Sequence, residues 1–160
     1  PSGRLDGTTP FWNAAPTEDN YDVAFIGRLL DRLEADYCID ESRVFSLGMS
    51  NGAQMSSLLA CAMPERIRAI GPIAGEEYLE PCDGAPVPII AFHGTDDFVP
   101  IAVMENLMHQ VIAAGTPARL LRFRKAGHGL SGTSPAELAR GYEVYGVQEQ
   151  VMWFRTYLGE

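Results

Sequence analysis

The chain has 160 residues, a formal charge of −9 and 46% hydrophobic residues, an ordinary composition for a globular domain. Its length predicts a single domain over residues 1–160 with one hydrophobic core. A surface this acidic repels phosphate backbones, which argues against a nucleic-acid partner. No run approaches 18 consecutive apolar residues, so the sequence predicts neither a membrane-spanning helix nor a membrane partner.

Helical and strand patterns alternate along most of the chain. Residues 1–19 are rich in Pro, Gly, Thr and Asn and predict an irregular loop. Apolar residues at helical spacing predict helices over residues 20–37, 53–63, 101–114 and 147–158. Short apolar runs predict strands over residues 43–48, 68–74, 87–93 and 118–124. Apolar strands separated by helices indicate an α/β fold, with a parallel sheet and helices on both faces.

The three cysteines, Cys38, Cys61 and Cys82, form no CxxC pair and have no histidine at metal-ligand spacing. We therefore expect no metal site. Two interpretations of the cysteines remain open, because sequence alone does not set connectivity. They are buried free thiols, or they form one disulfide and leave an odd cysteine for a segment outside this chain.

Chemically competent side chains follow three of the predicted strands. Ser50 follows the first strand, Asp96 and Asp97 follow the third, and His128 follows the fourth. The carboxyl ends of parallel strands meet at one edge of a sheet, where ligands bind in open α/β folds. The sequence therefore predicts a site at this edge, with the chain order Ser, Asp, His.

The proposed nucleophile lies in a GxSxG motif, Gly48-Met49-Ser50-Asn51-Gly52. A serine hydroxyl is a poor nucleophile unless it is exposed, oriented and paired with a base. A sharp strand-to-helix turn exposes it, and the glycines allow the close backbone approach that this turn needs. The motif follows a predicted strand and begins a predicted helix, which favours chemistry over an inert Gly-Ser turn.

His128 lies between Gly127 and Gly129, on a predicted tight loop from which its imidazole could reach the serine. The alternative is a loop histidine with a structural hydrogen bond. His109 is expected at the surface of a helix. His93 ends a strand, where we expect it to hold the following turn.

A base histidine needs a carboxylate on its other ring nitrogen, to fix its tautomer and stabilise the imidazolium. Asp96 and Asp97 are both placed for this role, and either could instead be a turn-forming residue. Glu76 and Glu77 follow a neighbouring strand and are weaker candidates.

These residues resemble the α/β-hydrolase fold, in particular the group of secreted bacterial esterases that contains polyhydroxybutyrate depolymerases, feruloyl esterases and acetylxylan esterases. The resemblance runs from about residue 10 to 160 and rests on the stretches 40–53, 59–61, 72–75, 91–95 and 127–128. It implies Ser50 as nucleophile, His128 as general base and no cofactor. It also implies an extracellular or periplasmic location.

The resemblance leaves two features of the site unsettled. Counting forward from His93-Gly94 selects Asp97 as the acid, whereas counting back from Val99-Pro100 selects Asp96; we favour Asp97. The group also carries earlier strands and a His-Gly-type loop that donates an N–H to the oxyanion. Those strands and the oxyanion loop are absent from this chain, which leaves Asn51 N–H as its donor and an apolar sheet edge open. We expect a second chain or segment to complete the sheet.

The sequence thus predicts a serine carboxylic-ester hydrolase, acting on a small-molecule or polymeric ester through an acyl-enzyme. A peptidase or thioesterase would use the same triad. A catalytically silent half-domain that acts as an interaction module is the alternative outside enzymology. A binding module for an insoluble polyester or polysaccharide is a weaker one, with Phe11, Trp12, Tyr142 and Tyr145 as its candidate aromatics.

Overall fold

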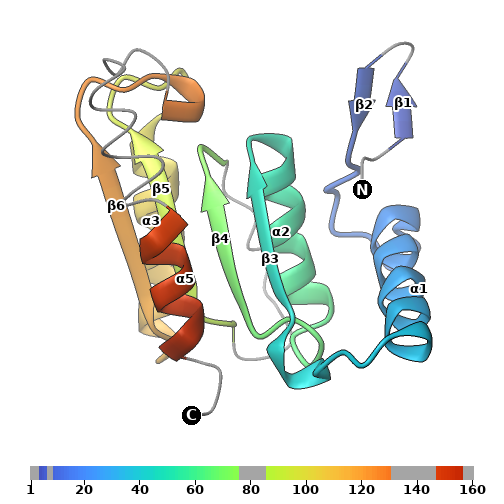
Figure 1. Ribbon diagram of the computed structural model, residues 1–160. Helices are drawn as coiled ribbons and strands as arrows, with labels where there is room; N and C mark the ends of the chain where they lie inside the picture. The colour runs from blue at the N-terminus through green and yellow to red at the C-terminus, as the bar shows by residue number, and fades with distance from the viewer. Residues whose placement is uncertain (1–3, 7–8, 76–85, 131–146, 157–160) are drawn as a thin grey trace.

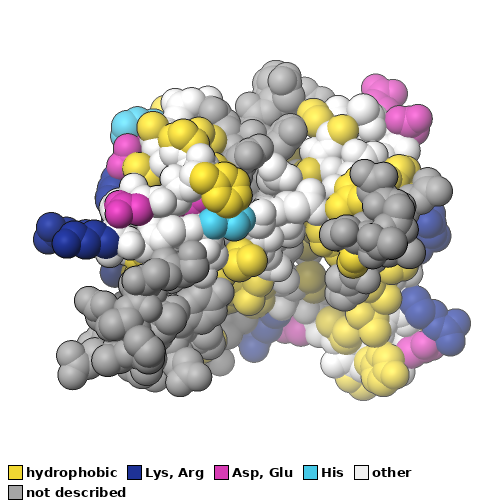
Figure 2. Space-filling view, turned by 90° about the horizontal axis from the view of Figure 1, so that it is seen from above, with side chains coloured by type: hydrophobic (Ala, Val, Ile, Leu, Met, Phe, Trp, Pro, Cys, Tyr) yellow, Lys and Arg dark blue, Asp and Glu magenta, His cyan; other side chains and the backbone are white. Residues whose placement is uncertain are grey.

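A computed structural model describes residues 4–6, 9–75, 86–130 and 147–156. Its centre is a four-stranded parallel sheet in the order β3 (Phe45–Met49), β4 (Ala69–Ile73), β5 (Ile89–Gly94) and β6 (Ala118–Phe123). The carboxyl ends of the strands meet at one edge, the upper edge in Figure 1 and the face toward the viewer in Figure 2. The predicted parallel sheet is confirmed.

Helices cover both faces of this sheet. They are α1 (Tyr21–Asp36), α2 (Asn51–Ala62), α3 (Ile101–Ala113) and α5 (Val147–Thr156). α2 and α3 pack behind the sheet in Figure 1, and α5 lies in front of it. Phe154 of α5 stacks on Phe45 of β3 with ring centroids 4.5 Å apart, which fixes α5 to that face. The predicted helices are confirmed, apart from residues 157–158, which lie outside the described residues.

α1 begins directly after Asn20, because the side chain of this N-cap residue satisfies free N–H groups of the first turn. Its Oδ1 accepts hydrogen bonds from the N–H groups of Asp22 (2.9 Å) and Val23 (3.1 Å). Its Nδ2 donates to the carbonyls of Asn13 and Ala15 at 2.8 and 2.7 Å. The buried Asn20 therefore joins the start of α1 to the segment that leads into it.

The prediction of an irregular loop over residues 1–19 is wrong in part. Arg4–Asp6 (β1) and Thr9–Phe11 (β2) form a small antiparallel sheet in which Asp6 pairs with Thr9. Only Gly7 and Thr8 separate the two strands, and a two-residue connection that begins with glycine is a hairpin signal. Three-residue strands are too short to show an alternating pattern, so composition dominated the prediction.

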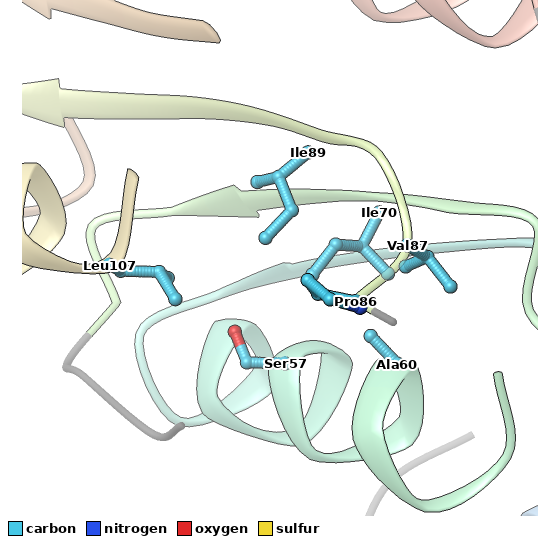
Figure 3. A pocket seen from close by; sticks show the side chains of 7 residues that line it. All are labelled: Ser57, Ala60, Ile70, Pro86, Val87, Ile89 and Leu107. Atoms are coloured by element: carbon cyan, nitrogen blue, oxygen red, sulfur yellow. The ribbon is translucent and has the colours of Figure 1, made fainter. Parts of the chain in front are cut away.

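The core lies between the sheet and the helices α2 and α3. Figure 3 shows the side chains of Ile70, Ile89 and Leu107 pointing toward Ser57 and Ala60 of α2. The space that they enclose has no room for a water molecule. This region is therefore packed core and not a binding pocket.

Two short 3-10 turns connect elements of the sheet layer, η1 (Glu41–Arg43) before β3 and η2 (His128–Leu130) after β6. Cys61 is disulfide-bonded, and Cys38 is free and exposed. The interpretation of the cysteines as buried free thiols is therefore wrong. Cys82 and most of the polar linker after Gly75 lie outside the described residues.

β3 forms one edge of the sheet within the described residues, as the sequence led us to expect. Leu47 and Met49 on this strand are 55% and 47% exposed. A groove of about 400 Å³ runs between α1 and this edge, with Trp12 and Ile26 among its lining residues. No helix in the part of the chain that the structure describes is long and apolar enough to cross a membrane.

Candidate active site

Ser50 occupies a strained turn between β3 and α2. Its backbone has φ 53° and ψ −121°, a conformation that costs a non-glycine residue about 1–3 kcal/mol. The Ser50 N–H donates to the carbonyl of Ile73 at 2.9 Å, and its carbonyl accepts from the N–H groups of Ala53 and Gln54. Both sides of the residue are thus held by regular structure, and strain of this kind is typical of functional turns.

The glycines of the motif have different structural roles. A Cβ added to Gly48 would lie 2.0 Å from the carbonyl oxygen of Gly52, so only glycine fits at position 48. A Cβ at Gly52 would meet nothing within 4 Å. The turn therefore requires its first glycine for the close backbone approach that the sequence predicted, and tolerates other residues at the second.

His128 begins η2, just beyond β6, and a second close approach fixes this loop. A Cβ on Gly94, at the end of β5, would lie 2.1 Å from the carbonyl oxygen of Ala126. The Asp96 N–H donates to that same carbonyl at 2.9 Å. The loop that carries His128 is therefore held directly against the carboxyl end of β5.

The Asp97 carboxylate contacts the His128 imidazole. His128 Nδ1 lies 3.0 Å from Asp97 Oδ1 and 3.2 Å from Oδ2. The Asp97 side chain is fully buried, and its Oδ1 also accepts from the N–H of Val99 at 2.9 Å. Asp96 is exposed and accepts a hydrogen bond from the Thr95 hydroxyl at 3.0 Å. Of the two candidate acids, Asp97 is the one in contact with His128.

Neighbours of Ser50 and His128 touch each other. A Cβ added to Gly129 would lie 2.9 Å from Met49 Sδ, so the methionine that precedes Ser50 packs against the glycine that follows His128. The structure therefore brings the β3–α2 turn and the histidine loop together at the carboxyl edge of the sheet. A surface histidine lies among hydrophobic side chains on this face in Figure 2.

His93 supports the loop that carries Asp97, as expected for a histidine that ends a strand. It is fully buried, and its Nε2 donates to the carbonyl of Val99 at 2.9 Å. Val99 thus uses its carbonyl to accept from His93 and its N–H to hold Asp97. The acid loop is therefore held at Val99, and Val99 in turn holds the Asp97 carboxylate.

Asn51 has a backbone N–H at the start of a helix, where an oxyanion can bind, and a side chain that fixes its position. It is the first residue of α2, where N–H groups have no intrahelical partner and the helix dipole favours negative charge. Its side chain pairs with the main chain of Trp12: Oδ1 accepts from the N–H at 2.6 Å, and Nδ2 donates to the carbonyl at 3.0 Å. The segment after β2 is therefore tied to the start of α2.

The remaining candidates do not join this cluster. His109 is exposed on α3, as expected. Phe11 is 37% exposed and Trp12 is half-buried. No group of metal-ligating side chains occurs within the described ranges. Glu76, Glu77, Tyr142 and Tyr145 lie outside those ranges.

The sequence did not predict the contact made by Phe98 or the role of the Asn51 side chain. The Phe98 ring packs on His128, with ring centroids 4.2 Å apart. A large apolar residue directly after two aspartates in a loop was the available signal. The pairing of Asn51 with Trp12 joins residues 39 apart and leaves no local signal.

Comparisons with known proteins identify relatives of this chain among hydrolases. Residues 18–158 match the model of the dienelactone hydrolase family. A probable feruloyl esterase C of Aspergillus niger is 37% identical over 78 residues, which cover 48% of this chain and 28% of that protein. Feruloyl esterase D of Neurospora crassa is 38% identical over 96 residues, covering 59% of this chain and 32% of that protein. The chain therefore spans about a third of the length of these curated relatives.

Solved esterase structures share the fold. The Bacillus cereus carboxylesterase superposes with a TM-score of 0.71 at 18% identity, covering 98% of this chain and 74% of that one. A thermostable esterase superposes with a TM-score of 0.69 at 24% identity, covering 85% of this chain and 36% of that one. The parallel sheet with helices on both faces is thus the α/β-hydrolase fold, and the chain belongs to the dienelactone hydrolase family.

Proposed function

We propose that this chain carries the catalytic residues of a serine carboxylic-ester hydrolase, with Ser50 as nucleophile, His128 as base and Asp97 as acid. The observation that carries the proposal is the 3.0 Å contact between His128 Nδ1 and the buried Asp97 carboxylate. The contact leaves the other ring nitrogen, Nε2, available for proton transfer. The strained serine turn beside this loop and the esterase relatives support the same reading.

The reaction follows from these roles. Ser50 Oγ attacks the ester carbonyl while His128 Nε2 takes its proton, and Asp97 stabilises the imidazolium that forms. His128 then gives the proton to the leaving alcohol as the C–O bond breaks, which leaves an acyl-serine. Water attacks the acyl group with His128 again as base, and the acid product and free Ser50 are released. The residues require no cofactor or metal for these steps.

The Asn51 N–H is the oxyanion donor that we assign within this chain. A second donor lies on a segment beyond the described residues or on a second chain. Loss of one such donor costs about 100- to 1000-fold in rate. The exposed edge of β3 and the groove beside it support docking of a further strand there.

We assign an aromatic or polymeric ester as substrate class, because the curated relatives are named feruloyl esterases. A polyester substrate of the polyhydroxybutyrate depolymerase type is the alternative. An extracellular or periplasmic location is supported by the disulfide at Cys61, since disulfides persist in oxidising compartments.

A substrate panel tests the proposal against its rivals. Purified protein is assayed with p-nitrophenyl esters, thioesters and peptide anilides, beside the Ser50→Ala variant. We expect turnover of esters that is lost in the variant. Hydrolysis of anilides or thioesters at higher kcat/KM would favour a peptidase or thioesterase. No turnover by folded protein that associates on gel filtration would favour the interaction module.

The pH profile is a second test of the same assignment. A histidine base must be neutral to accept the serine proton, and imidazole loses its proton near neutral pH. We therefore expect kcat/KM to rise with pH on the acidic side of the profile. A flat profile from about pH 5 to 8 would contradict the role of His128.

A further inference from the structure

Phe98 is an exposed aromatic residue between two buried groups, the Asp97 carboxylate and Val99. Its side chain is 77% exposed, whereas Val99 is 5% exposed and the Asp97 side chain is fully buried. The hydrogen bonds from Val99 N–H to Asp97 Oδ1 and from His93 Nε2 to the Val99 carbonyl hold the backbone directly after Phe98. The exposed ring is thus fixed in place by its own loop.

This ring lies on the imidazole of His128. The two centroids are 4.2 Å apart and the planes are tilted by 36°. One part of the ring covers the histidine, and the high exposure means that most of its surface remains open to another molecule. A single exposed phenyl group is unremarkable on a protein surface, so its position beside the base carries the argument.

A second exposed apolar side chain borders the same histidine loop. Met49 is 47% exposed and packs against Gly129. Phe98 and Met49 thus present a ring and a thioether at the carboxyl edge of the sheet, one beside Asp97 and the other beside Ser50. Hydrophobic groups adjoin a histidine on this face in Figure 2. A planar apolar group is the ligand chemistry that such a pair accepts.

The contact with His128 indicates which half of an ester lies there. The base must reach both the serine oxygen and the oxygen of the leaving alcohol. A substrate group that packs against Phe98, which covers the base, therefore lies on the alcohol side of the scissile bond. We propose that Phe98 is a specificity-determining residue that binds an aromatic group of the leaving alcohol by stacking. This inference rests on the proposed ester hydrolysis.

Two esters that share one acyl group and differ only in the alcohol test this role of Phe98. Benzyl acetate and cyclohexylmethyl acetate differ in the aromatic character of the alcohol, while both leave as primary alkoxides. In Phe98→Leu, we expect kcat/KM for benzyl acetate to fall about 3- to 10-fold through KM, as an aromatic contact is lost. The value for cyclohexylmethyl acetate changes less than about twofold, because leucine keeps the apolar contact. Phe98→Tyr retains the wild-type preference.

Phe25→Leu is the matched control, since Phe25 is 39% exposed on α1, away from the cluster. An equal loss for both acetates in Phe98→Leu would overturn the proposal, because it would show that the ring only positions His128. Methyl cinnamate and methyl 3-cyclohexylpropenoate differ instead in the aromatic character of the acyl group. If Phe98→Leu lowered kcat/KM for methyl cinnamate alone, the assignment of Phe98 to the alcohol side would be overturned. Failure of the proposed function itself is distinguishable, because neither acetate would then be hydrolysed and Ser50 would not react with a fluorophosphonate.

Discussion

Asp97 and Asp96 are adjacent in sequence but differ in environment, and this difference gives a matched pair of variants. The Asp97 side chain is fully buried against His128, whereas Asp96 is exposed beside Thr95. An Asp97→Asn side chain with its amide oxygen at Oδ1 still accepts from Val99 N–H and from His128. The substitution therefore removes the negative charge and keeps the shape and these hydrogen bonds.

The magnitude follows from the distance. At 3.0 Å and an effective dielectric constant of about 20, a carboxylate–imidazolium pair is worth about 5 kcal/mol. The imidazolium forms only during the reaction, so the lost interaction raises the barrier and not the energy of the resting protein. We expect Asp97→Asn to lower kcat about 10³- to 10⁴-fold. Its free energy of unfolding should change by less than about 1 kcal/mol, because the hydrogen bonds of the resting protein are kept.

Asp96→Asn supplies the control, because its carboxylate is exposed and screened by solvent. We expect its kcat to change less than about twofold. Both variants are assayed for p-nitrophenyl acetate hydrolysis, and urea denaturation checks that each is folded. Comparable losses in the two variants, or more than a tenth of wild-type kcat in folded Asp97→Asn, would refute the assignment of Asp97.

Four further substitutions test the serine turn, the Asn51 side chain and the Asp40 carboxylate. Gly48→Ala places a Cβ 2.0 Å from the carbonyl oxygen of Gly52, so it should lower the free energy of unfolding by more than about 3 kcal/mol. Gly52→Ala should leave the free energy of unfolding unchanged or raise it. Urea denaturation measures both. Asn51→Ala loses both hydrogen bonds to the segment after β2, and should cost about 1–3 kcal/mol in the same assay; an unchanged midpoint would contradict the pairing. Hydrogen bonds from Ser42 lower the pKa of Asp40, so the stability that this carboxylate provides is present above its ordinary value of 3.8 and lost as pH falls. The difference in Tm between wild type and Asp40→Ala should therefore shrink on acidification, and a difference that grew would contradict this sign.

Local patterns account for what could be predicted of the fold. The helix over residues 20–37 and the strands that follow have clear apolar periods, and the GxSxG motif carries its own geometry at Gly48 and Ser50. The antiparallel pair β1 and β2 was not predicted, because each strand has only three residues. An alternating apolar pattern can be recognised only in strands longer than three residues, so composition decided the prediction here.

The site could be predicted only to the level of strand ends. Spacing along the chain favours Asp97 when it is counted from His93-Gly94, but Asp96 when it is counted from Val99-Pro100. Which carboxylate turns inward depends on the Val99 N–H and on the His128 loop, and that loop arrives 31 residues later. The stacking of Phe98 on His128 depends on the same long-range approach. Such contacts are set by tertiary packing, so the local sequence can indicate a candidate residue but not its partner.

The most direct test of the account is the reactivity of Ser50. Intact-protein mass is measured after exposure to a fluorophosphonate, for wild type, Ser50→Ala and the neighbouring hydroxyl variant Ser46→Ala. The account predicts one phosphonyl adduct on wild type and on Ser46→Ala, and none on Ser50→Ala. A folded wild-type protein that remains unlabelled, or an adduct that persists in Ser50→Ala, would contradict the claim that Ser50 is the nucleophile.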